Sequence, residues 1–257
     1  MKKRTQKLLA MFLAVAMAIS MTACGGSGAP ASSGGGTGNT AAAGENGAAA
    51  GEEKLSSRDT LNMASKSEPT SLDPAQTKDL VTWMYMYNVS DPLLYFNWAT
   101  QEYEPAIATE WSESEDGKEY TFTIREGVKF HNGDIMTVDD VVYSLNRAIA
   151  SSFTAQTNAC IDRFEKVDDT HIKAYLKYAY APFLEIMTNP SYAIVSQKAV
   201  EECEAAGRDF GREPVGVGAY KLTKWQSGNR LEFERHDDDY RGTPKMKYIN
   251  WTIITDS

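Results

Sequence analysis

Cysteine and histidine, which often act in catalysis and metal binding, are scarce in this chain of 257 residues. It contains three cysteines and three histidines, and it has no Gly-x-Ser-x-Gly nucleophile turn and no phosphate-binding loop. The histidines His131, His171 and His236 lie far apart and show no metal-ligand spacing. Gly216-Val217-Gly218 lacks the third glycine of a dinucleotide-binding fingerprint, and a strand pattern follows it instead of a helix. The sequence therefore predicts no catalytic residue and no cofactor, and hence a protein that is not an enzyme.

Clusters of positive charge are missing after the first seven residues. The chain has 26 basic and 35 acidic residues and a formal net charge of −9. Nucleic acids and anionic lipids are recognised through clustered Lys and Arg, so neither is expected as a direct partner. Acidic residues gather at His236-Asp237-Asp238-Asp239, where carboxylates could bind a hard cation. A solvated turn between two strands is the favoured interpretation, and no metal site is predicted.

The cysteines offer little scope for cross-links. Apart from Cys24, discussed below, only Cys160 and Cys203 are present, and no CxxC spacing occurs. An exported pair could form a disulfide, but the two residues lie in segments that look structurally separate. Free or buried thiols are favoured, and whether the two residues pair stays open.

The first 23 residues have the order of a secretory signal peptide. Basic residues at positions 2–7 precede an apolar stretch, Leu8 to Ile19, and small residues follow. This stretch is shorter than the roughly 20 residues that span a bilayer as a helix. Thr22-Ala23-Cys24 resembles the lipobox of bacterial lipoproteins, in which the cysteine becomes the mature N-terminus and carries the lipid. Lipidation of Cys24 is expected, with a plain secreted protein as the alternative.

Residues 24–53 form a segment rich in Gly, Ala, Ser and Thr. Such a composition cannot bury enough apolar surface to offset the entropy of ordering, so we expect a disordered tether. About 30 flexible residues give a mean reach of roughly 30 Å. The expected location is the outer face of the cell membrane, or its periplasmic side if an outer membrane exists.

The remaining 200 or so residues have an ordinary globular composition, and their hydrophobic periodicity predicts both strands and helices. A capping box at Thr137 and Asp140 opens a helix whose apolar stripe contains Val138, Val141, Val142, Leu145, Ala148 and Ile149. A second helix, at 81–89, is expected to bury Trp83, Met84, Tyr87 and Val89, with a ligand-stacking aromatic site as the alternative. A third helix is expected at 197–206, with Gly207 as its left-handed stop. Strands are predicted at 61–64, 120–125, 172–176, 220–225, 230–235 and 248–254. The class is α/β or α+β.

Three blocks of sequence are the most distinctive part of the chain. The first is SEPTSLDP at 67–74, and the third is PVGVGAYKL at 214–222. The second runs from ATEWS at 108–112 through DGKEYTFTIREGVKFHNG at 116–133 to TVDDVVYS at 137–144. Together they resemble the extracellular solute-binding proteins that serve oligopeptide, dipeptide and nickel ABC importers, often called family 5. The resemblance covers the globular body but only about the first half of the family's length.

This resemblance implies a fold and a domain plan. The fold would be α/β, a periplasmic-binding-protein-like type II lobe with mixed sheets and an inserted α+β domain, the second lobe missing. Residues 54–90 and 196–257 would form lobe one, discontinuous and incomplete. Residues 91–195 would form the inserted domain. The family binds its ligand in the cleft between two lobes, so few binding residues carry over.

The resemblance also implies a function and a small set of binding residues. Main-chain groups of Thr77, Lys78, Asp79 and Leu80 would contact the bound peptide, and Phe153 and Thr154 would approach the cleft. The chain would be the substrate-binding lipoprotein of an ABC importer, capturing peptides or another small solute for a permease complex. The alternatives are a lipid-anchored cell-surface hydrolase and a truncated, non-functional receptor fragment. Ligand identity, the permease and whether the chain naturally ends at Ser257 stay open.

Overall fold

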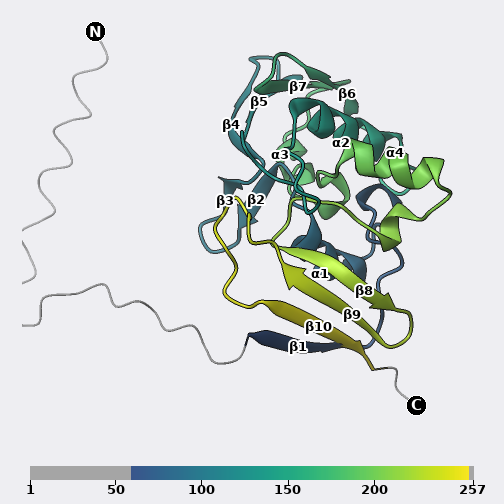
Figure 1. The fold of residues 1–257 in the computed structure, drawn as a ribbon. Helices are drawn as coiled ribbons and strands as arrows, with labels where there is room; N and C mark the ends of the chain where they lie inside the picture. Colours follow the sequence, from purple (N-terminus) through teal and green to yellow (C-terminus); the bar gives the residue numbers. More distant parts are fainter. Residues whose placement is uncertain (1–58, 255–257) are drawn as a thin grey trace, which may run out of the picture. The chain divides into compact units, whose positions relative to one another are not determined.

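The structure, a computed structural model, describes residues 59–254 (Figure 1). The predicted signal peptide at 1–23, Cys24 and the tether at 24–53 lie outside the described residues. Within 59–254, no helix is long and apolar enough to cross a membrane.

The described chain alternates between strands and short helices. In chain order the elements are β1 Thr60–Ser65, η1 Pro74–Gln76, α1 Leu80–Val89, β2 Leu94–Asn97, β3 Glu102–Pro105, β4 Ala108–Glu113, β5 Glu119–Ile124, α2 Val138–Ala150, β6 Ile161–Lys166, β7 His171–Leu176, α3 Phe183–Ile186, η2 Pro190–Tyr192, α4 Gln197–Ala205, η3 Phe210–Arg212, β8 Tyr220–Gln226, β9 Arg230–Arg235 and β10 Tyr248–Ile253.

The first sheet joins the two ends of the described chain. Its strand order is β1-β10-β9-β8; β1 runs parallel to β10, and the other neighbours are antiparallel. Ile249, Trp251 and Ile253 of β10 are buried, as their alternation predicts. They share a hydrophobic core with α1, where the rings of Tyr85 and Trp251 lie 4.3 Å apart. Figure 1 shows α1 against this sheet.

Helix α1 forms where the sequence predicts it, and Val89 is buried as predicted, but the rest of the predicted buried face is not confirmed. Met84 and Tyr87 are 46% and 48% exposed, and Trp83 is only partly buried. The buried residues are Thr82, Tyr85, Met86 and Val89. Because apolar side chains surround the whole helix, their spacing does not select a face, and the contact with the sheet does.

The second large sheet has the order β4-β5-β7-β6 and is antiparallel throughout. Tyr120, Phe122 and Ile124 of β5 are buried on one face, as predicted. Helix α2 packs on this sheet through its predicted stripe, and the capping box of Thr137 and Asp140 is present. Strands β2 and β3 form a separate hairpin beside it.

The glycines of the third sequence block serve a close approach between backbones. The Gly218 N–H donates to the carbonyl of Val89 at the end of α1, 2.9 Å away. A Cβ at Gly218 would lie 2.5 Å from the Asn88 carbonyl oxygen, and one at Gly216 would overlap Val89 and Ser90. The Gly-x-Gly pattern is thus explained by packing on α1.

The structure also tests the predictions for the cysteines, for Gly207 and for the acidic run at 236–239. Cys160 and Cys203 are free and buried, so the favoured interpretation of unpaired thiols is confirmed. Gly207 ends α4 with a φ of +65°, as predicted. The carboxylates of the 236–239 run form separate ion pairs, Asp237 with Arg235, Asp238 with Lys129 and Asp239 with Arg241. Within 59–254, no group of three or more His, Cys, Asp or Glu side chains could hold a metal ion.

Candidate functional site

The segment from Asp73 to Leu80 is held rigid by local hydrogen bonds. The hydroxyl of Thr77 donates to Asp79 Oδ2 at 2.9 Å, and the N–H of Thr82 donates to Asp79 Oδ1 at 2.8 Å. Asp79 is thereby the N-cap of α1. Partial burial raises the pKa of Asp79, but the hydrogen bonds from Thr82 and Thr77 outweigh this effect and hold the pKa below its usual value.

An ion pair fixes the same segment to α2. Arg147 donates to both carboxylate oxygens of Asp73, at 2.5 and 2.6 Å, and the Asp73 side chain is inaccessible to solvent. The hydroxyl of Ser151 donates to the Ala75 carbonyl at 2.5 Å. The loop before α1 is therefore clamped against the C-terminal end of α2.

The short helix η2 connects this segment to the turn after α2. Ser191 donates its hydroxyl to the Thr77 carbonyl at 2.9 Å and accepts from the Trp83 indole N–H at 3.2 Å. The next residue, Tyr192, shares a hydrogen bond of 3.1 Å with Thr157. The sequence reasoning missed Ser191 and Tyr192; the Asn189-Pro190 turn signal just before them could have marked the position.

The six sequence-predicted binding residues divide by exposure. Leu80 is 73% exposed and Phe153 45% exposed, and Lys78 is also exposed. Thr77 and Thr154 are buried; Thr154 donates to the Ala148 carbonyl at 2.5 Å and closes the end of α2. Only backbone groups of Thr77 and Thr154 are thus candidates for contact, whereas Lys78, Leu80 and Phe153 offer side chains.

Apolar side chains on α1 extend the exposed surface of this segment. Leu80, Met84 and Tyr87 follow one another at helical spacing and are 73%, 46% and 48% exposed. We call these three residues the α1 stripe. Adjacent exposed apolar residues are typical of surfaces that bind another molecule. The α1 stripe and the segment 77–80 together form the candidate binding face.

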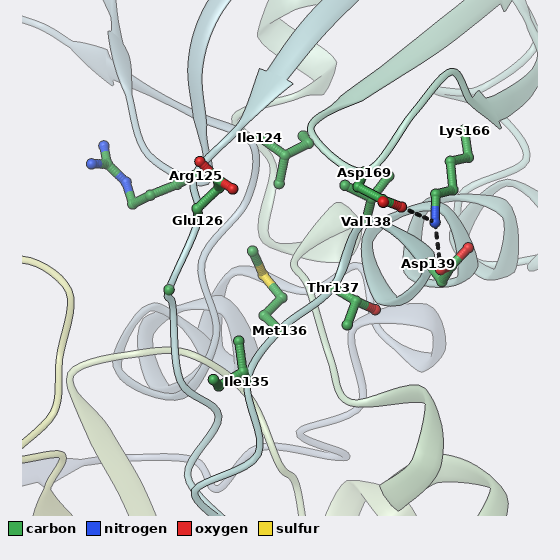
Figure 2. A pocket seen from close by; sticks show the side chains of 11 residues that line it. Ile124, Arg125, Glu126, Ile135, Met136, Thr137, Val138, Asp139, Lys166 and Asp169 are labelled. Atoms are coloured by element: carbon green, nitrogen blue, oxygen red, sulfur yellow. Dashed lines mark hydrogen bonds and ion pairs between the residues drawn. The ribbon is translucent and has the colours of Figure 1, made fainter.

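The cavity in Figure 2 lies elsewhere, at the N-terminal end of α2. It has a volume of about 260 Å³, and none of the sequence-predicted binding residues lines it. Lys166 lies between Asp139 and Asp169, at 2.8 and 2.9 Å, as the dashed lines show. Arg125 points away from the cavity and donates to the Ala106 carbonyl. Its charged rim is thus largely satisfied internally, and it is not a candidate for solute capture.

A second buried ion pair joins the start of the middle segment to the end of the chain. Arg241 contacts Asp91 at 3.2 Å and Asp239 at 3.0 Å, and Tyr95 donates to Asp91 at 2.5 Å. Burial raises the pKa of Asp91, and Arg241 offsets only part of this effect. This network fixes residues 91–95 against 239–241.

The chain is similar in sequence to a family of known bacterial proteins. Residues 102–257 match the model for "Bacterial extracellular solute-binding proteins, family 5 Middle". The dipeptide-binding protein DppE of Bacillus subtilis is 30% identical over an aligned length of 276 residues. This alignment covers 99% of this chain and 47% of that protein. The glutathione-binding protein GsiB of Salmonella typhimurium is 28% identical over 209 residues, covering 79% of this chain and 40% of that protein.

Solved structures give the same result. The periplasmic binding protein DppA from Helicobacter pylori, in complex with the peptide STSA, matches with a TM-score of 0.71 and 26% identity. The match covers 77% of this chain and 43% of that chain. NikZ from Campylobacter jejuni, in complex with Ni(L-His), matches with a TM-score of 0.69 and 26% identity over 77% of this chain and 39% of that one. The chain spans about half, or less, of the length of these relatives.

Proposed function

We propose, since the chain belongs to the bacterial extracellular solute-binding proteins of family 5, that it captures peptides or another small solute for an ABC importer. The observation that carries this proposal is the candidate binding face. A segment in which Lys78 and Leu80 are exposed is clamped between α1 and α2 beside the α1 stripe. The relatives include proteins described as dipeptide-binding and as complexes with a peptide.

In this proposal the backbone of Thr77–Leu80 pairs with the main chain of a peptide. Backbone donors and acceptors suit a receptor of broad specificity, because they contact groups that every peptide has. Leu80 and Phe153 would pack against side chains of the peptide. The side chain of Thr154 would hold the turn on which Phe153 lies, so only the backbone of Thr154 would approach the peptide.

The proposed domain plan keeps residues 54–90 and 196–257 in lobe one and 91–195 in the inserted domain. Two features support it. The sheet β1-β10-β9-β8 takes its strands from the first and last segments, and β4-β5-β7-β6 takes its strands from the middle one. Each sheet has its own hydrophobic core.

The proposal includes a lipid anchor on Cys24 and a permease partner. A tether of about 30 residues would keep the globular body within roughly 30 Å of the outer face of the membrane. From there a solute-loaded body would meet its permease complex. The work would be selective capture, without covalent chemistry.

Calorimetric titration of the full chain with a set of alanine-containing dipeptides and tripeptides tests this function. We expect saturable binding, and no peptide hydrolysis when the same mixtures are followed by chromatography. Leu80→Asp should weaken binding about tenfold or more, because it places a charge in the α1 stripe. The matched control is Val167→Asp, an exposed apolar residue on the turn between β6 and β7.

Two results would contradict the proposal. Turnover of the peptides by the pure chain would support the hydrolase alternative. A chain that melts cooperatively yet binds none of the peptides would support the alternative of a non-functional fragment.

A further inference from the structure

A second cavity lies between the turn after α2 and the short helix α3. Its volume is about 280 Å³, which suits a single long side chain better than a whole solute. The lining residues include Thr157 from the turn, Tyr180 and Pro182 before α3, Glu185 on α3, and Asn189 after it. No sequence block singled out this region.

The charge of this cavity is negative and is not neutralised. Glu185 is exposed and forms no ion pair with any residue in the range 59–254. No Lys or Arg lines the cavity. By contrast, Lys166 in the cavity of Figure 2 pairs with two carboxylates. The Glu185 carboxylate is therefore available to a cation from outside.

Aromatic rings lie near the same carboxylate. Tyr180 lines the cavity, is 37% exposed, and meets Tyr178 edge to face with ring centroids 6.4 Å apart. Burial and the nearby Glu185 carboxylate together raise the pKa of Tyr103. A ring face and a carboxylate both attract ammonium and guanidinium groups.

The cavity is within reach of a peptide bound at the candidate binding face. Asn189 accepts from the N–H of Ser191 at 2.8 Å, and the Ser191 hydroxyl donates to the Thr77 carbonyl at 2.9 Å. Two extended residues span about 7 Å. The cavity therefore neighbours the segment at Thr77, with η2 between them.

We propose that this cavity binds the cationic side chain, lysine or arginine, of a captured peptide. This inference rests on the proposed function and makes Glu185 a determinant of specificity. An apolar side chain would remove water from Glu185 without compensating its charge. An anionic side chain would be repelled by it. A basic side chain satisfies both the carboxylate and the ring of Tyr180.

The test compares tripeptides that differ only in charge. Ala-Lys-Ala is titrated against Ala-Nle-Ala, where norleucine has the length of lysine without the ammonium, and the lysine is also moved to the first and last positions. We expect the full chain to prefer lysine in at least one position by roughly fivefold to tenfold at low salt. Glu185→Gln should abolish this preference and leave norleucine binding unchanged. High salt should reduce the preference.

The matched control is Glu126→Gln, which removes an exposed carboxylate from the cavity of Figure 2. This variant should keep the preference for lysine. Equal binding of lysine and norleucine peptides by the unaltered chain would overturn the inference and leave the proposed function standing. Loss of the preference in Glu126→Gln as well would also overturn it, because the effect would then follow overall charge.

A second measurement separates the cavity from peptide capture. Acetyl-lysine-methylamide and acetyl-norleucine-methylamide are titrated into the chain, and the ring resonances of Tyr180 are followed by NMR. A shift with the lysine probe alone, lost in Glu185→Gln, supports the cavity even if no tripeptide binds and the proposed function fails. Absence of any shift in a folded chain overturns the inference.

Discussion

Asp73 shows how one residue can fix the position of a loop, here the segment before α1 that we propose as part of the binding face. Its side chain is inaccessible to solvent, and Arg147 is its ion-pair partner among the described residues. Removing one partner of a buried pair leaves the other charge without compensation, and this is much more costly than replacing both. The pair therefore couples the stability of the body to the geometry of the segment before α1.

We expect Arg147→Met to lower the free energy of unfolding by about 3–5 kcal/mol. Urea denaturation followed by tryptophan fluorescence measures this change. The control is Lys198→Met, which removes the exposed pair with Asp134 and should change the midpoint little. Equal losses in the two variants would contradict a special role for the buried pair.

Gly218 gives a second test at this scale. A Cβ there would lie 2.5 Å from the Asn88 carbonyl oxygen, which belongs to a helix and cannot withdraw easily. We expect Gly218→Ala to destabilise the chain by about 1–3 kcal/mol through overpacking, measured by thermal unfolding. Gly228→Asn is the contrast, because that site is open and its φ of +69° is tolerated by Asn. An unchanged midpoint for Gly218→Ala would show that α1 can shift.

At the scale of elements, the loop before α2 and the loop after β9 bring His131 and His236 together. His131, before α2, donates its Nε2–H to the Gly218 carbonyl at 2.9 Å, and its ring meets that of His236, after β9, with centroids 5.1 Å apart. Burial lowers the pKa of His131 to about 4 and also lowers that of His236. Lys221 adds to the lowering, whereas Asp239 opposes it.

Acid should therefore weaken the folded state. The unfolded chain binds protons on both histidines below about pH 6.5, while the folded chain resists protonation until lower pH. The stability contributed by the neutral pair is complete above pH 6.5 and is lost progressively as the pH falls toward 4. We expect His236→Asn to flatten this dependence, seen as a smaller drop in melting temperature between pH 7 and pH 4.5. Parallel pH profiles for the parent and the variant would contradict this assignment.

The two main helices show what sequence periodicity could and could not predict. Helix α2 alternates polar and apolar residues, so its capping box and its buried stripe were both predicted correctly. Helix α1 has apolar residues all round, so its existence was predicted but, apart from Val89, its buried residues were not. In strand β6 the two buried residues, Ile161 and Phe164, are separated by two exposed residues. The register shift between Ile161 and Arg163 causes this departure from strict alternation. The two-residue hydrophobic period of a strand therefore could not predict β6.

At the scale of the whole molecule, the α/β fold implied by the three sequence blocks is confirmed by the match to known binding proteins. The pairing of β1 with β10 could not be read from local pattern, because it joins segments at opposite ends of the described chain. The exposure of each residue in the segment 77–80 could not be predicted from the sequence either. Burial of Thr77 and Thr154 depends on contacts with Asp79, Ser191 and Ala148 that no spacing rule encodes.

The location of the whole molecule depends on Cys24 in the proposed lipid anchor. We expect Cys24→Ala to release the chain from the membrane fraction into the medium or the periplasm, and to abolish labelling by radioactive palmitate. Cys160→Ala is the control, because that thiol is free and buried; it should leave both readouts unchanged. Retention of palmitate in Cys24→Ala would point to another anchor.

The parallel pair of β1 and β10 has a consequence for how the chain folds. Asn62 of β1 and Asn250 of β10 are hydrogen-bonded neighbours 188 residues apart in sequence. During synthesis or export from the N-terminus, β1 emerges first and has no partner until β10 follows. Its Leu61 and Met63, still 41% and 37% exposed in the final fold, stay open to other chains throughout that interval. Closing so long a loop is slow, so β1 stays unpaired for longer than a strand whose partner is close in sequence, and aggregation through this strand is the expected hazard of folding.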